Sequence, residues 1–275
     1  MRRESFSTPA PPRLDLRLQS GELEVRAGAT SETTVELEPL GGDESRRAVE
    51  EARVELREGT VVVEVPEQRL FGLLSRGTGV RLSVVCPSGS SLRSRSGSAD
   101  VRTSGVLGAA EVETGSGDVE VEEVVGNAAA KAGSGDVKVG RVGGDLAVQT
   151  GSGDVSAGSI GGAGTLRSAS GDVLVREAAG SLSVQSASGD QRVEAVSAGE
   201  VSLRSASGDI YVGVRRGSSV WIDAGSMSGD TTSELALEGA PPEQGDEGPH
   251  VEIRATTMSG DVHVARAAAA SQLGT

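Results

Sequence analysis

Hydrophobic and polar residues alternate along most of this chain within a unit that returns every 18 residues. The tripeptide Ser-Gly-Asp marks each unit, and Ser98-Ala99-Asp100 is a variant first copy. Its aspartates stand at positions 100, 118, 136, 154, 172, 190, 209, 230 and 261, so five intervals of 18 residues precede intervals of 19, 21 and 31. We interpret the longer intervals as the same unit with insertions. Such a period predicts a repeat architecture, because a short unit buries its apolar face only by stacking on copies of itself.

Each aspartate is predicted to open a β-strand with one apolar face. In most units the residues one and three positions after it are apolar, as Val119 and Val121 are, and the residue between them is polar, as Glu120 is. This alternation is typical of a half-buried strand. A second strand follows in each unit, with an apolar inner column and a polar outer column. The outer column contains Lys131, Gln149, Arg167, Gln185 and Arg204.

The predicted fold class is all-β: a single-stranded β-solenoid, or β-helix, with 18-residue coils and a β-rich N-terminal cap. Ser-Gly-Asp repeats are expected to form the solenoid over residues 93–266, followed by a disordered tail over 267–275. An 18-residue coil fits a cross-section of two sides or three, and the sequence leaves this open.

Residues 1–92 lack the strict repeat but are rich in strand patterns. One short helix is expected within them, from Glu44 to Arg53, with Asp43 as its N-cap. We predict that this segment caps the solenoid, because an open sheet edge would invite strand addition from another molecule.

The repeat breaks again near the other end of the chain. An acidic loop rich in proline and glycine covers residues 238–249, after which the pattern returns once around Asp261. Trp221, Leu235 and Leu237 precede that loop, and we predict that these larger side chains cover a terminal coil.

The composition agrees with a narrow interior. The chain has 275 residues, of which 40 are glycine, and its aromatic residues are Phe6, Phe71, Tyr211 and Trp221. Stacked valines leave little room for rings, and glycines suit the corners. The single cysteine, Cys86, excludes an internal disulfide and is predicted to be a buried, inert thiol.

Charge and hydropathy limit the partners. The formal net charge is −14, which disfavours nucleic acid as a partner. The first residues, Met1-Arg2-Arg3, are followed by Glu4 rather than by an apolar run, so no secretory signal is recognised. No stretch approaches the ~20 apolar residues that span a bilayer. We therefore expect no membrane insertion and a cytoplasmic location, with envelope association through a partner left open.

The Ser-Gly-Asp tripeptide is best explained as a structural corner. Glycine permits a tight bend and aspartate accepts hydrogen bonds from backbone amides. Inward-facing serines are expected beside it: Ser134, Ser152, Ser170 and Ser188.

The less favoured interpretation of the corner is a row of cation sites. Calcium-binding nonapeptide solenoids carry a similar glycine-aspartate loop, but their spacing differs from the one found here. The row would consist of Asp118, Asp136, Asp154, Asp172, Asp190 and Asp209. Apart from this row, no metal site and no cofactor are predicted.

Catalytic chemistry finds little support. Paired-carboxylate catalysis, as in a carbohydrate-acting β-helix enzyme, needs two acids in different environments, whereas a uniform row offers similar ones. Of the two histidines, His250 falls in a loop and His263 on an outward column, where we expect it to be solvated. No nucleophile elbow, phosphate-binding loop or zinc-protease motif occurs. The protein is predicted not to be an enzyme.

The sequence resembles the bacterial putative-adhesin family, β-strand-repeat domains of unknown function of the DUF4097 type. The resemblance rests on Phe6-Ser7-Thr8-Pro9, on the segment 80–90, on the repeated coils and on the region of Trp221. It implies a non-enzymatic protein of a kind often linked to cell surfaces or envelope stress.

The predicted function is that of a non-catalytic β-solenoid interaction or scaffold protein, which contacts an unknown protein partner or assembles with itself. The candidate contact face is the polar outer column Lys131, Gln149, Arg167, Gln185 and Arg204. A calcium-binding repeat module and a carbohydrate-acting enzyme are the alternatives.

Overall fold

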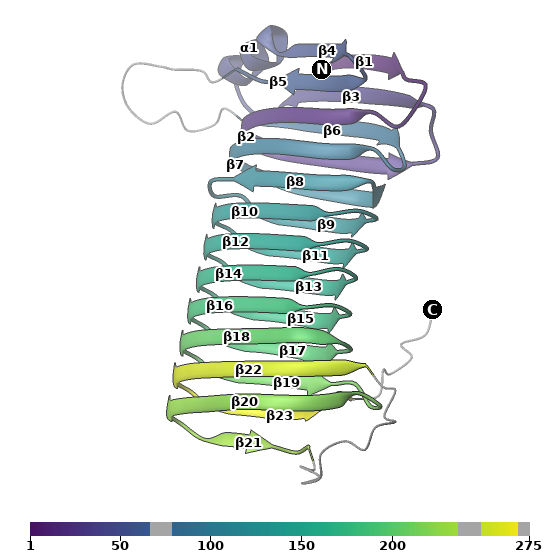
Figure 1. Ribbon diagram of the computed structural model, residues 1–275. Helices are drawn as coiled ribbons and strands as arrows, with labels where there is room; N and C mark the ends of the chain where they lie inside the picture. The colour runs from purple at the N-terminus through teal and green to yellow at the C-terminus, as the bar shows by residue number, and fades with distance from the viewer. Residues whose placement is uncertain (67–78, 236–248, 269–275) are drawn as a thin grey trace. The chain divides into compact units, whose positions relative to one another are not determined.

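The computed structural model describes residues 1–66, 79–235 and 249–268, and most of them lie in strands (Figure 1). The chain divides into two compact units, Met1–Val142 and Gly143–Thr275. Within each unit, parallel strands stack coil upon coil, which confirms the predicted β-solenoid.

Each regular coil consists of two strands joined by two turns. In the first unit these are β8 (Ala109–Thr114), β9 (Val119–Val124), β10 (Ala128–Ser134) and β11 (Val137–Val142). β10 pairs in parallel with β8, and β11 with β9, so that every paired residue lies beside the residue 18 positions earlier. The cross-section therefore has two sides.

The second unit repeats this arrangement. β12 (Leu146–Ser152), β14 (Gly164–Ser170), β16 (Leu182–Ser188) and β18 (Gly199–Ser207) pair in order and form what we call the even sheet. β13 (Val155–Ile160), β15 (Val173–Ala178), β17 (Gln191–Val196) and β19 (Ile210–Val214) form the odd sheet.

The core of the second unit lies between these two sheets. Its side chains are small and branched, as the alternation predicted, because each must pack on its counterparts in the coils on either side. The buried positions include Val148, Leu166, Val184 and Leu203 on the even sheet and Val155, Val175, Val193 and Val212 on the odd sheet.

The corners explain the repeated glycine. Gly171 has a φ of 143°, and a Cβ placed on it would lie 2.2 Å from the carbonyl oxygen of Gly153 in the neighbouring coil. Any side chain there would push the coils apart, so this position requires glycine.

A long strand near the N-terminus is itself a coil of the solenoid. β2 (Arg13–Gly28) pairs in parallel with most of β7 (Ser91–Leu107), and its other edge pairs with β5 (Thr60–Glu64) and β6 (Val80–Pro87). The boundary predicted at residue 92 falls inside β7.

Antiparallel strands and one helix lie beyond that coil. β1 (Arg2–Ser7) pairs with β3 (Glu32–Pro39), β3 with β6, and β4 (Arg53–Arg57) with β5. The helix α1 (Asp43–Glu51) matches the expected one, although its N-cap is Gly42 rather than Asp43.

At the C-terminal end the coils do not follow sequence order. β22 (His250–Ser259) lies between β18 and β20 (Ser219–Ser228), and β23 (Val262–Arg266) lies between β19 and β21 (Thr231–Ser233). The late units are copies of the same repeat, but the last of them does not stack in sequence order. The chain instead skips one coil position after β19 and fills it with its last coil (Figure 1).

Trp221 does not cover the terminal coil as predicted. Its side chain points outward from β20, 46% exposed, because it falls on the polar phase of that strand. The guanidinium carbon of Arg254 lies 5.9 Å from the ring centroid. Leu235 is buried as expected, whereas Leu237, most of the acidic loop and the tail from residue 269 lie outside the described residues.

Candidate functional site

The Ser-Gly-Asp aspartates form a ladder of hydrogen bonds at one corner of each coil. In the second unit, the amide nitrogen of Asp172 donates to Oδ1 of Asp154 at 2.9 Å, and that of Asp190 to Oδ1 of Asp172 at 2.8 Å. The ladder continues in spatial order through Asp209, Asp261 and Asp230, each step 2.8 Å long. In the first unit the same contact joins Asp118 to Asp100 and Asp136 to Asp118.

This geometry agrees with the corner interpretation. One carboxylate oxygen of each of these acceptors binds an amide of the next coil, and the acids stand in single file. Across the described parts of the chain, no three His, Cys, Asp or Glu side chains are grouped so that they could hold a metal ion.

The predicted inward serines were placed two residues too late. Ser152, Ser170 and Ser188 are exposed, because the backbone has already turned outward at the corner. Ser134 in the first unit is exposed for the same reason. The inward hydroxyls instead belong to residues two positions earlier in the chain. They donate hydrogen bonds to backbone carbonyls at the corners. The Oγ of Ser186 donates to the carbonyl of Ser188, and those of Ser168 and Ser205 do the same at Gly153 and Ser207.

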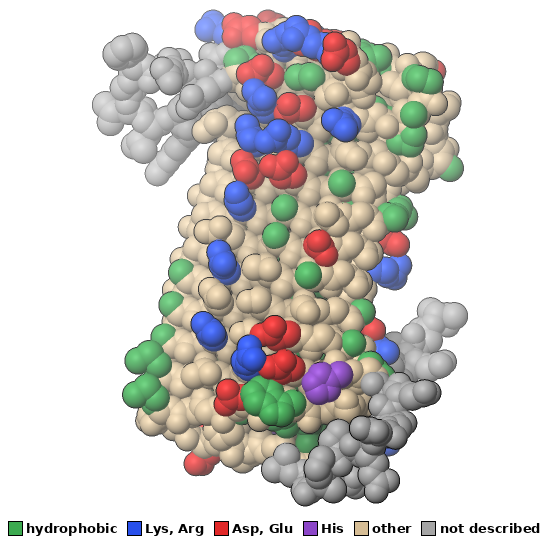
Figure 2. Space-filling model, in the orientation of Figure 1, with side chains coloured by type: hydrophobic (Ala, Val, Ile, Leu, Met, Phe, Trp, Pro, Cys, Tyr) green, Lys and Arg blue, Asp and Glu red, His purple; other side chains and the backbone are tan. Residues whose placement is uncertain are grey.

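Four of the five predicted contact residues form one column on the even sheet of the second unit. Gln149, Arg167, Gln185 and Arg204 lie directly beside one another on β12, β14, β16 and β18, and all are exposed. We call them the Arg/Gln column. The neighbouring outward positions hold the small side chains Ala147, Thr165, Ser183 and Ser202. Figure 2 shows separate basic side chains along this face, with uncharged groups between them.

The fifth residue, Lys131, belongs to the first unit and has an acidic partner. Its Nζ lies 3.8 Å from Glu113, which also binds Arg95 at 3.1 Å. The period already contains this information, because the residue 18 positions before Lys131 is Glu113. The residues on either side of Arg167 are glutamines, so Arg167 has no such partner on its sheet.

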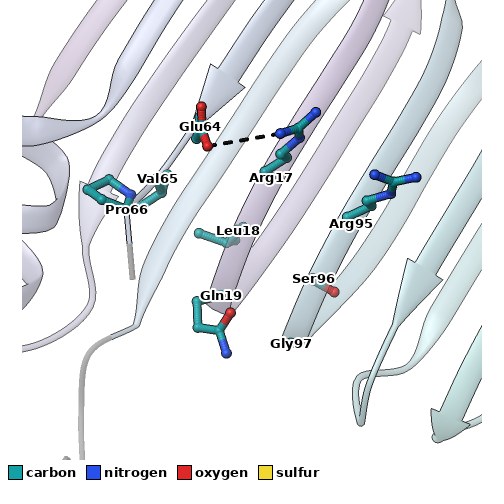
Figure 3. A pocket seen from close by; sticks show the side chains of 9 residues that line it. All are labelled: Arg17, Leu18, Gln19, Glu64, Val65, Pro66, Arg95, Ser96 and Gly97. Carbon is teal, nitrogen blue, oxygen red and sulfur yellow. Dashed lines mark ion pairs between the residues drawn. The ribbon is translucent and has the colours of Figure 1, made fainter. Parts of the chain in front are cut away.

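Two cavities of the first unit are lined by side chains of both charges. One of about 360 Å³ lies beside β2 and β7, where Arg17 points toward Glu64 and Arg95 lies on the neighbouring strand (Figure 3). Arg17 is 4.0 Å from Glu64 and 3.4 Å from Asp15. A second cavity, of about 390 Å³, includes Arg102, Glu120 and Lys138.

Glu120 shows how local these pairings are. The hydrogen bond from Lys138, 2.8 Å long, lowers the pKa of this carboxyl, and Arg102 at 3.8 Å adds to the effect. Histidine and cysteine are both absent from the residues that line these two cavities.

His263 is not simply solvated. Its ring stacks on Tyr211 with centroids 5.5 Å apart, and the guanidinium carbon of Arg192 lies 4.3 Å from the centroid of the Tyr211 ring. The Nδ1 of His263 is 2.7 Å from the Thr232 hydroxyl, and its Nε2 is 3.5 Å from Glu234. The residue spacing gave no signal for this cluster, because it depends on the insertion of the last coil.

Comparison with known protein families shows which family the chain belongs to. Residues 12–265 match the family described as Toastrack DUF4097. The chain belongs to this family. The resemblance drawn from the repeat is thereby confirmed.

Several solved structures align with nearly the whole of this Toastrack chain. A putative adhesin from Bacteroides fragilis NCTC 9343 is 12% identical, with 96% of each chain covered and a TM-score of 0.46. A putative adhesin from Parabacteroides distasonis ATCC 8503 is 10% identical over 95% of this chain and 96% of that one, with a TM-score of 0.36. A protein of that organism described as a putative lipid binding protein is 11% identical over 96% of each chain, with a TM-score of 0.33. A comparison with functionally curated proteins finds no match.

Two further features of the Toastrack chain bear on its chemistry. Cys86 is fully buried in β6, as predicted, and burial raises the pKa of its thiol, which favours the protonated form. Among the described residues, no helix is long and apolar enough to cross a membrane.

Proposed function

We propose that this Toastrack protein is a non-catalytic interaction scaffold whose contact surface is the Arg/Gln column of the second unit. The observation that carries the proposal is a difference in ion pairing: the basic residues of this outer column have acidic partners in the first unit but not in the described part of the second. In the first, Arg95 and Lys131 share Glu113. In the second, Arg167 and Arg204 have no acidic side chain within 4 Å among the described residues.

Exposed, unpaired cations at fixed positions suit recognition. The parallel ladders hold Arg167 and Arg204 in register, so their backbone positions need no ordering when a partner binds. Charges on such a surface guide encounter and fix the orientation of a complementary partner. The small side chains beside them leave the guanidinium groups accessible from one side.

The absence of catalysis is part of the proposal. The Asp ladder places its acids in equivalent hydrogen-bonded environments, which does not separate an acid from a base. The pair formed by the His263 ring and the Thr232 hydroxyl lies outside both cavities described above.

Site-specific photo-crosslinking tests the contact surface. A benzophenone amino acid replaces Gln185 in the column, and in a matched control it replaces Arg176, which is exposed on β15 of the odd sheet. We expect discrete adducts in cells from position 185 only. Charge reversal by Arg167→Glu and Arg204→Glu should abolish them. Equal adduct patterns from both positions would show that the column is not a preferred contact surface.

A further inference from the structure

The unpaired arginines repeat along the coil axis in a way that suits a linear polymer. Arg167 pairs with Gln185, and Gln185 pairs with Arg204, so the two guanidinium groups stand two coils apart. With strands spaced at roughly 4.8 Å, this separation is about 9.6 Å. Gln149 extends the column by one further coil.

The repeat distinguishes between kinds of polymer. Side chains on one face of an extended peptide recur every ~6.8 Å, whereas the coils recur every ~4.8 Å. Only one or two side chains of such a peptide would therefore align with the column. A pyranose ring in an extended polysaccharide advances about as far as one coil, so sugars and coils stay in step. Alternate sugars would then face Arg167 and Arg204.

The side-chain chemistry of the face selects the substituents. Guanidinium binds a carboxylate through two parallel hydrogen bonds. The amides of Gln149 and Gln185 and the adjacent hydroxyls of Thr165, Ser183 and Ser202 can both donate to and accept from sugar hydroxyls. A ligand of alternating acidic and neutral sugars matches this alternation of arginine and glutamine.

We propose that the Arg/Gln column binds a linear acidic polysaccharide that carries a carboxylate on every second sugar and lies along the coil axis. This inference rests on the contact surface proposed above and names its ligand. The acids of β18 and β22 do not oppose it directly, because Arg254 binds both Glu200 and Glu252. At physiological salt, charges of the protein that lie more than about 8 Å from the column are largely screened.

Binding of defined oligosaccharides to the full chain tests the inference. The probes are fluorescent oligomers of alternating glucuronate and N-acetylglucosamine with two, four and six sugars, measured by anisotropy at physiological salt. Engaging both arginines requires at least three consecutive sugars. We therefore expect a large gain in affinity from the disaccharide to the tetrasaccharide and little from four sugars to six.

Two matched double variants distinguish the contribution of the column arginines to binding from that of the protein's net charge. Arg167→Gln with Arg204→Gln should weaken tetrasaccharide binding at least tenfold, because two charge-assisted contacts are lost. Arg176→Gln with Arg216→Gln changes the net charge equally, at exposed arginines outside the column, and should leave the affinity within about twofold.

Three results would overturn the inference. They are no binding at millimolar tetrasaccharide, equal weakening in both double variants, and equally tight binding of inorganic polyphosphate, which would indicate charge attraction alone. If binding fails while crosslinks still form selectively from position 185, the polysaccharide inference falls and the contact surface stands. A protein in those adducts would identify the other class of partner. If both experiments fail, the proposed function falls as well.

Discussion

Gln191 interrupts the buried apolar column of the odd sheet with an amide. It lies between Val173 and Ile210, and its Nε2 donates to the carbonyl oxygen of Arg204 at 2.7 Å. Its Oε1 is buried and has no partner. A buried polar atom without a hydrogen bond costs about 1–3 kcal/mol, more than one ordinary hydrogen bond contributes.

Gln191→Val should therefore raise the free energy of unfolding by about 1 kcal/mol, because it restores the side chain found at Val173 and removes the unpaired oxygen. Urea unfolding of the whole chain measures this. Gln185→Val, on the exposed column, is the matched control and should change stability by less than about 0.5 kcal/mol. A loss of stability in Gln191→Val would show that the amide bond to Arg204 outweighs the unpaired oxygen.

Gly171 offers the opposite test at the same scale. Gly171→Ala should lower the free energy of unfolding by about 2 kcal/mol or more, since the methyl group meets the Gly153 carbonyl and the residue is held at positive φ. A Cβ placed on Gly225 in β20 would meet no atom within 4 Å, so Gly225→Ala should be nearly neutral. Comparable losses in both variants would contradict the steric account of the corner.

Among the elements, the corner ladder combines two opposing effects. Most of its aspartates accept an amide hydrogen bond from the next coil, as Asp190 does from Asp209, which favours stacking. Equivalent charges about 4.8 Å apart repel by ~0.9 kcal/mol in water, which opposes it.

Asp190→Asn keeps the accepting oxygen and removes the charge, so its stability should equal or exceed that of the unmodified protein at low salt. Asp190→Ala removes the acceptor as well and should cost about 1 kcal/mol. Thermal unfolding of the two variants side by side separates charge from hydrogen bonding. Equal destabilisation by both would mean that the negative charge itself is required at this corner.

Calcium provides an independent test of the ladder. Ca²⁺ takes six to eight oxygen ligands, whereas these acids stand in single file with one oxygen bound to an amide. Millimolar calcium should therefore leave the melting temperature unchanged and release no heat on titration. A rise in melting temperature that disappears in Asp190→Asn would instead support the cation-site alternative.

Much of this element-level structure follows from the sequence. A period of 18 with alternating apolar residues defines both the strands and their register, because a shift of one residue would expose every valine. The same period pairs Lys131 with Glu113 and leaves Arg167 between glutamines. The alternation does not show where the backbone turns outward, and so the prediction of an inward Ser170 is wrong.

For the second unit as a whole, coil order is the property that the local pattern could not give. An interval of 31 residues is compatible both with a looped-out insertion and with a coil that folds back between two others. Only the non-local pairing of β22 with β18 and β20 distinguishes them. The His263 contacts with Tyr211 and Thr232 follow from that pairing and were missed with it.

This interleaving makes the terminal coil depend on the last coil of the chain. β20 pairs with β22 alone among the described strands, and Ile253 of β22 is fully buried whereas Ile222 of β20 is half-buried. In stacked repeats, stability is the sum of unit and interface terms, so weakening the inner coil loosens everything outside it.

Hydrogen exchange followed by mass spectrometry should reveal this dependence. Ile253→Ala should cost about 2–4 kcal/mol and accelerate exchange in β22 and β20 together, while β16 keeps its protection. Ile222→Ala should cost less and accelerate exchange in β20 alone, because β22 remains paired with β18. If Ile253→Ala left β20 protected, the terminal coil would have to be held by contacts other than its pairing with β22, and the inserted coil would not be what secures this end of the unit.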